Sequence, residues 1–144
     1  MDFQHLSPQY LAELARQLAF LSAFLGGFAA TFLATLVISA PKKRLSSWIL
    51  SLTAFSASFF IVAVLVFIGL VIVLNPHAPK NVASPSSMTL SRVLGILSFL
   101  FGMLCLLSSI GLSGWLHSKR TGLATSLAAL MGIALALWVS VGVG

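Results

Sequence analysis

Acidic side chains are almost absent from this chain of 144 residues, whose only two are Asp2 and Glu13. Proton-coupled and sodium-coupled transporters, rotor subunits and calcium pores with carboxylate rings place an acid at membrane depth. Neither acid lies in a long apolar run, so the sequence disfavours all of these classes. It also offers no pair of carboxylates for general acid–base catalysis.

Histidine and cysteine are scarce as well, with three histidines and one cysteine in the whole chain. His5, His77 and His117 share no helix face, which gives no support for a metal or haem site. Cys105 has no second cysteine to pair with, so no intrachain disulfide can form. No glycine-rich phosphate loop or Ser/His/Asp set is present either. We therefore expect no cofactor, no metal ion, no catalytic residue and no enzyme activity.

Charged residues of both signs make up only 7% of the chain, whereas 59% of its residues are hydrophobic. A soluble domain carries about 25% charged residues. The apolar residues form four long runs, at about residues 18–38, 48–74, 93–116 and 123–143. Each run is long enough, at about 1.5 Å per residue, to cross a hydrocarbon layer of roughly 30 Å. The sequence predicts an all-α integral membrane protein, a single domain over residues 1–144 that folds as a four-helix transmembrane bundle.

The segment before the first run has its own helical pattern. Ser7 and Pro8 suit the cap and first position of a helix, and Glu13 with Arg16 can form its polar face. We expect a short N-terminal amphipathic helix, which either lies in the headgroup layer or runs straight into the first span. The run that follows exceeds the 7–15 residues of a signal-peptide core, so we expect it to be retained.

Basic residues predict the topology. The short connections 40–46 and 117–122 carry five of the eight lysines and arginines, and the opposite face carries the other three. By the positive-inside rule, both short connections are predicted to be cytoplasmic. The longer connection, residues 75–91, is rich in proline, asparagine and serine and is predicted to be an exposed loop. We therefore interpret the net charge of +6 as basic residues that set the topology and face lipid phosphates, and we expect no binding to nucleic acid.

Small residues suggest how the spans associate, because helices in lipid approach closely where side chains are small. The fourth run has small residues at every fourth position, which predicts helix packing through Ala124, Ala128, Gly132, Ala136 and Ser140. The first run has two adjacent stripes of this kind, one beginning at Ser22 and one at Ala23.

The first run also carries a candidate pore lining. Phenyl, glycine and hydroxyl side chains fall on nearly one face, at Phe24, Gly27, Phe28, Thr31 and Thr35. Such a face can line a narrow pore with phenyl constrictions and hydroxyl rings. The alternative is that each hydroxyl bonds to the carbonyl one turn back and has no further role.

The order of these features resembles the Orai family of store-operated calcium channels. The resemblance is carried by residues 27–29 (Gly-Phe-Ala), 54–57 (Ala-Phe-Ser-Ala), Gly102 to Trp115, and 125–126 (Thr-Ser). It implies an oligomer with the first helix at the pore axis, Thr35 at one mouth and Phe28 near a hydrophobic gate. The chain departs from the family in having Thr35 where the selectivity glutamate stands, in lacking the basic residues of the inner pore, and in its positive-inside orientation. The resemblance therefore implies a pore with little valence preference.

Two functions of different classes follow. The chain is either an oligomeric, channel-like membrane protein with a pore lined by the first span, or a non-catalytic accessory or structural subunit of a larger membrane complex. The expected partners are the lipid bilayer and either further copies of the chain or other membrane subunits. A carrier for a lipid-like solute, bound in a groove between helices, stays open because such sites need few charges.

Overall fold

The computed structural model of the chain describes residues 8–39, 44–75, 85–116 and 118–142, and every regular element in them is helical. The elements are α1 (Pro8–Ser39), α2 (Arg44–Leu74), α3 (Pro85–Ser113), the one-turn 3₁₀ helix η2 (Gly114–Leu116) and α4 (Lys119–Gly142). The predicted all-α class is thereby confirmed.

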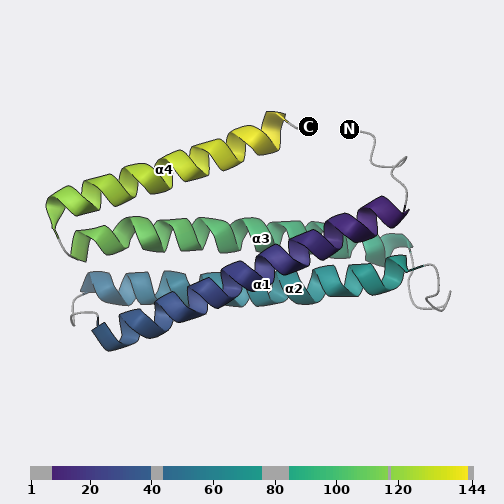
Figure 1. Ribbon diagram of the computed structural model, residues 1–144, viewed down its shortest axis with the longest axis horizontal. Coiled ribbons are helices and arrows are strands. Elements are labelled where there is room, and N and C mark those ends of the chain that lie inside the picture. The colour runs from purple at the N-terminus through teal and green to yellow at the C-terminus, as the bar shows by residue number, and fades with distance from the viewer. Residues whose placement is uncertain (1–7, 40–43, 76–84, 117, 143–144) are drawn as a thin grey trace.

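Successive helices run in opposite directions (Figure 1). Helix α1 packs on α2, α2 packs on α3, and α4 packs on α3. In the view of Figure 1, α1 crosses α2 and α3 at an angle, while α4 starts beside the end of α3 and rises away from it. The ends of α1 and α3 and the starts of α2 and α4 lie together at one end of the bundle.

Within the described part of the chain, three helices are long and apolar enough to cross a membrane: Gln9–Ser39, Arg44–Leu74 and Thr89–Leu116. At about 1.5 Å per residue, each exceeds a hydrocarbon layer of roughly 30 Å, so each must tilt or protrude if it spans one. The fourth predicted span, residues 123–143, falls on α4 except for residue 143, which lies outside the described residues.

The expected N-terminal amphipathic segment does not form a helix of its own. Helix α1 begins at Pro8 and continues without a break to Ser39. Of the two arrangements open from the sequence, the chain adopts the one in which the segment runs straight into the apolar run. Glu13 and Arg16 still form a polar pair there, with Nη1 of Arg16 3.7 Å from Oε2 of Glu13.

The helices also extend into the predicted connections. Helix α3 begins at Pro85 because proline is well tolerated at a first helical position, so the loop expected over residues 75–91 is shorter. Of connections 40–46 and 117–122, residues 44–46 belong to α2 and residues 119–122 to α4. Helix α4 begins after Ser118, whose Oγ accepts a hydrogen bond from the Thr121 amide at 3.2 Å and so caps the helix. Residues 40–43, 76–84 and 117, and with them His77 and His117, lie outside the described residues, as does His5.

The core of the bundle is the side chain of Phe60 on α2. It is fully buried and contacts Ala29 on α1 and Leu106 on α3. Small residues let the neighbouring backbones reach it: a Cβ on Gly26 would lie 3.2 Å from the Cβ of Phe60, and one on Gly102 would lie 3.0 Å from its Cε1. This is the close approach through small residues that helix association in lipid requires.

Several hydroxyls within the helices bond to their own helix, as one sequence interpretation predicts. Ser22 Oγ donates to the Leu18 carbonyl at 2.7 Å, and Thr53 Oγ1 donates to the Ile49 carbonyl at 2.8 Å. Ser56 differs, because its buried Oγ donates to the Gly102 carbonyl at 2.8 Å and so links α2 to α3.

Candidate functional site

Helix α1 has one face that packs and an opposite face that does not. Ala15, Ala19, Ser22 and Ala29 are buried. Nine residues are about two and a half turns of an α-helix, so two residues nine apart point in opposite directions. Thr31 is therefore opposite Ser22, and Phe28 is opposite Ala19. In the stripe beginning at Ser22, Ser22 is buried and Gly26 lies against Phe60 of α2, whereas the stripe beginning at Ala23 is exposed.

All five residues predicted to line a pore lie on this outward face. Phe24 and Phe28 are 67% and 49% exposed, and Gly27, Thr31 and Thr35 are exposed as well. A Cβ placed on Gly27 would have no neighbour within 4 Å. The structure thus brings the five together on one surface, which we call the outer face of α1.

The outer face of α1 is uncharged and offers oxygen lone pairs and phenyl rings. Thr31 Oγ1 donates to the Gly27 carbonyl at 2.9 Å, and Thr35 Oγ1 donates to the Thr31 carbonyl at 2.6 Å. Each hydroxyl hydrogen is therefore used within α1, and the oxygen can still accept from water or approach a cation. Phe28 is stacked on Phe32, with ring centroids 6.4 Å apart. Such a surface can constrict and partly hydrate a passage, but it carries no charge with which to select ions by valence.

The small residues predicted to pack on the fourth run do not all face the same surroundings in the structure. Ala124 and Ala128 are exposed, whereas a Cβ on Gly132 would lie 3.7 Å from the side chain of Leu107. The side chains of Ala136 and Ser140 lie outside the described residues. Helix α4 also lies close to α3 at Ala129, because a Cβ on Gly111 would lie 3.1 Å from the Cβ of Ala129.

The junction between α3 and α4 is held by side chains that the stripe prediction did not include. Trp115 Nε1 donates to Ser126 Oγ at 3.0 Å, and Thr125 Oγ1 donates to the Gly111 carbonyl at 3.0 Å. The indole of Trp115 also covers Gly122, where a Cβ would lie only 2.7 Å from the ring. Trp115 therefore packs the turn between α3 and α4.

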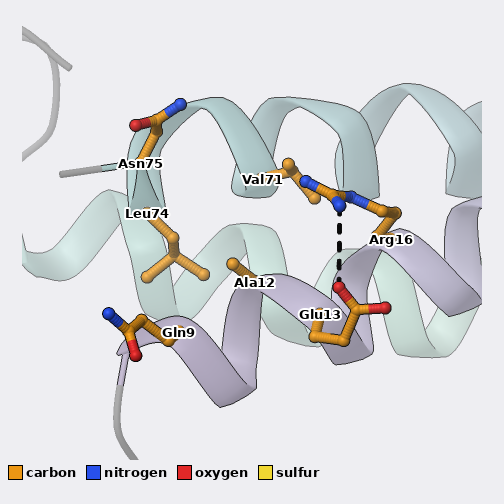
Figure 2. Close-up of a pocket in the computed structure, with 7 residues that line it drawn as sticks. All are labelled: Gln9, Ala12, Glu13, Arg16, Val71, Leu74 and Asn75. Atoms are coloured by element: carbon orange, nitrogen blue, oxygen red, sulfur yellow. Dashed lines mark ion pairs between the residues drawn. The ribbon is translucent and has the colours of Figure 1, made fainter. Parts of the chain in front are cut away.

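A cavity of about 280 Å³, with both polar and apolar lining residues, lies between α1 and α2 at the end where α1 begins (Figure 2). Its lining residues are Gln9, Ala12, Glu13, Arg16, Val71, Leu74 and Asn75. The charges of Glu13 and Arg16 are paired across the wall of this cavity, so it has no net charge to attract an ion.

A second cavity, of about 400 Å³, lies at the same end and is lined by all three of α1, α2 and α3. Most of its lining is apolar: Leu11, Leu14, Ala15 and Leu18 of α1, Phe67 and Leu70 of α2, and Val93 and Ile96 of α3. Thr89 and Arg92 of α3 complete it, and Arg92 is the one charged residue in this lining. We call this cavity the Arg92 groove. The sequence marks Arg92 only as a topology signal, and nothing in it places residues so distant in the chain together.

Among the residues that the structure describes, no three His, Cys, Asp or Glu side chains come close enough to hold a metal ion. No protein-family model matches this sequence, and comparisons with curated proteins and with solved structures give no match either. The resemblance to the Orai family accordingly stays an expectation, and any function is argued from the outer face of α1 and the Arg92 groove.

Proposed function

We propose that this chain is a non-catalytic, multi-pass membrane protein that assembles as a homo-oligomer and forms a channel-like pore lined by the outer face of α1. The observation that carries the proposal is the outward position of Gly27, Thr31 and Thr35 on an apolar helix. A glycine and two hydroxyls that face lipid gain less free energy from that contact than large apolar side chains do. The same residues are favoured at a helix–helix contact or along a hydrated path.

The proposal includes α4 as a fourth span. This helix has 24 residues, about 36 Å at 1.5 Å per residue, and its two charged residues, Lys119 and Arg120, stand at its start. Arg44, at the start of α2, lies at the same end of the bundle (Figure 1). This grouping of positive charge supports cytoplasmic placement of connections 40–46 and 117–122.

Within the pore, Phe28 is proposed as the hydrophobic constriction and Thr35 as one mouth, as the Orai resemblance implies. The outer face of α1 has no acid, and the Thr31 and Thr35 oxygens are its polar groups. We therefore propose passage of small ions with little preference for valence.

Ion flux through proteoliposomes tests the proposal directly. Purified protein is expected to release a trapped potassium load, and Phe28→Ala is expected to speed the release because a phenyl constriction blocks by dewetting. Phe55→Ala is the matched control, since Phe55 is also exposed, at 59%, but lies on α2. Absence of flux, or equal rates for the two variants, would contradict a pore along α1.

The second candidate is an accessory subunit, favoured by the exposed Ala124 and Ala128 on α4. These small residues contact no close partner at the α3 junction and suit a helix of another protein. Particle mass in mild detergent separates the two: a ring of identical chains supports the pore, whereas a monomer that is stable only beside foreign chains supports the accessory role.

A further inference from the structure

The Arg92 groove joins an apolar lining to one cation, the Arg92 guanidinium, which forms no ion pair with any residue that the structure describes. Arg92 Nε is buried and has no hydrogen-bond partner among the described residues. The one ion pair formed among those residues is that of Arg16 with Glu13, and Glu13 lines the other cavity. A buried guanidinium nitrogen without a partner is costly, so an anionic acceptor within reach would be bound favourably.

The groove also has a volume and a position that suit a lipid. Its volume of about 400 Å³ lies within the usual range of ligand pockets. Val93 and Leu18, which line it, are the first residues of two apolar runs, so Arg92 stands where the hydrocarbon layer is expected to begin. A phosphate at that depth meets the guanidinium, while the chain attached to it meets Phe67 and Ile96.

We propose that the Arg92 groove binds one acyl chain of an anionic phospholipid, whose phosphate accepts hydrogen bonds from the Arg92 guanidinium. Arginine suits this role because its planar group donates two parallel hydrogen bonds to a phosphate and keeps its charge. Basic pockets between membrane helices recognise anionic lipid headgroups in this way. The site belongs to the single subunit and does not depend on a pore.

Native mass spectrometry of the detergent-solubilised protein, offered equal amounts of phosphatidylglycerol and phosphatidylcholine, tests the proposal. The unmodified chain is expected to retain phosphatidylglycerol with about tenfold preference, the factor equivalent to about 1.4 kcal/mol. Arg92→Gln is expected to abolish the preference and Arg92→Lys to keep most of it. Arg16→Gln is the matched control, because Arg16 lies at the same end of the bundle but lines the other cavity.

The apolar half of the site has its own pair of variants. Ile96→Trp fills the groove and is expected to lower retention of both lipids, whereas Leu97→Trp, at a neighbouring exposed position outside the lining, is expected to leave it unchanged. Equal retention of the two lipids by the unmodified chain, or an undiminished preference in Arg92→Gln, would overturn the proposal. Displacement of the lipid by excess inorganic phosphate would overturn it too, since it would leave the acyl groove without a role.

Discussion

Replacing Gly26 and Gly27 separately by leucine tests which face of α1 packs against α2. The two glycines are adjacent, so the gain from replacing a helical glycine, about 0.5–1 kcal/mol, is nearly common to both variants. Their surroundings differ: a Cβ on Gly26 would lie 3.2 Å from the Cβ of Phe60, and a Cβ on Gly27 would have nothing within 4 Å.

The magnitude follows from how firmly Phe60 is held. Its ring is fully buried, stands edge-on to Phe99 with centroids 6.0 Å apart, and lies so near Gly102 that a Cβ there would be 3.0 Å from it. The ring cannot retreat, so the remaining carbons of a leucine at position 26 must push α1 away from α2. Overpacking of this kind costs about 1–3 kcal/mol. We expect Gly27→Leu to exceed Gly26→Leu in free energy of unfolding by about that amount.

The assay is titration with a denaturing detergent, followed by helical circular dichroism and by proteolysis, in a mild detergent that keeps both variants monomeric. Monomers are needed because Gly27→Leu is also expected to disturb any contact between subunits through the outer face of α1. Equal stabilities, or a more stable Gly26→Leu, would refute the assignment of the packing face and with it the outward position of Thr31 and Thr35.

Two further substitutions test individual contacts. Ser56→Ala removes the buried hydrogen bond to the Gly102 carbonyl and is expected to lower the free energy of unfolding by about 0.5–1.5 kcal/mol, whereas Ser58→Ala, on an exposed hydroxyl, should lower it far less in the same titration. Gly122→Ala requires the Trp115 ring to move, since a Cβ would lie 2.7 Å from it; we expect a shift in tryptophan emission, and an unchanged spectrum would count against this packing.

The helical class could be predicted from the sequence because it follows from solvent: long uncharged runs in lipid must satisfy their own backbone. The ends of the helices could not be predicted in this way. An apolar run ends where the polarity of the side chains changes, whereas a helix ends where the backbone leaves the helical conformation. Pro85 starts α3 eight residues before the expected span at 93, since proline fits a first helical turn. Pro8 does the same for α1, which merges the expected amphipathic helix with the span.

The candidate site could likewise be predicted from the sequence only in part. Helical periodicity predicted that Gly27, Thr31 and Thr35 share a face, and they do. Which of the two small stripes packs inward depended on where Phe60 lies, a fact of tertiary structure. The Arg92 groove could not be predicted, because its walls come from three separate segments, residues 11–18, 67–70 and 89–96, which only tertiary packing brings together. The same packing buries the Nε of Arg92, which has no hydrogen-bond partner among the described residues.

The two functional proposals require different surfaces of the bundle to be buried in the assembly. Helix α1 packs mainly on α2, and α4 packs mainly on α3, so the outer face of α1 and the exposed Ala124 and Ala128 of α4 belong to different helix pairs of the bundle. A pore lined by α1 buries the first surface in the oligomer and leaves the second toward lipid, whereas an accessory role through α4 does the reverse. Small residues gain little free energy from lipid contact. The surface used for assembly is therefore the one at which replacing a small residue by a larger one dissociates the native assembly. Leucine at position 27 or at position 128 changes one surface without touching Phe60, and the particle mass of each variant therefore reports which proposal the protein follows.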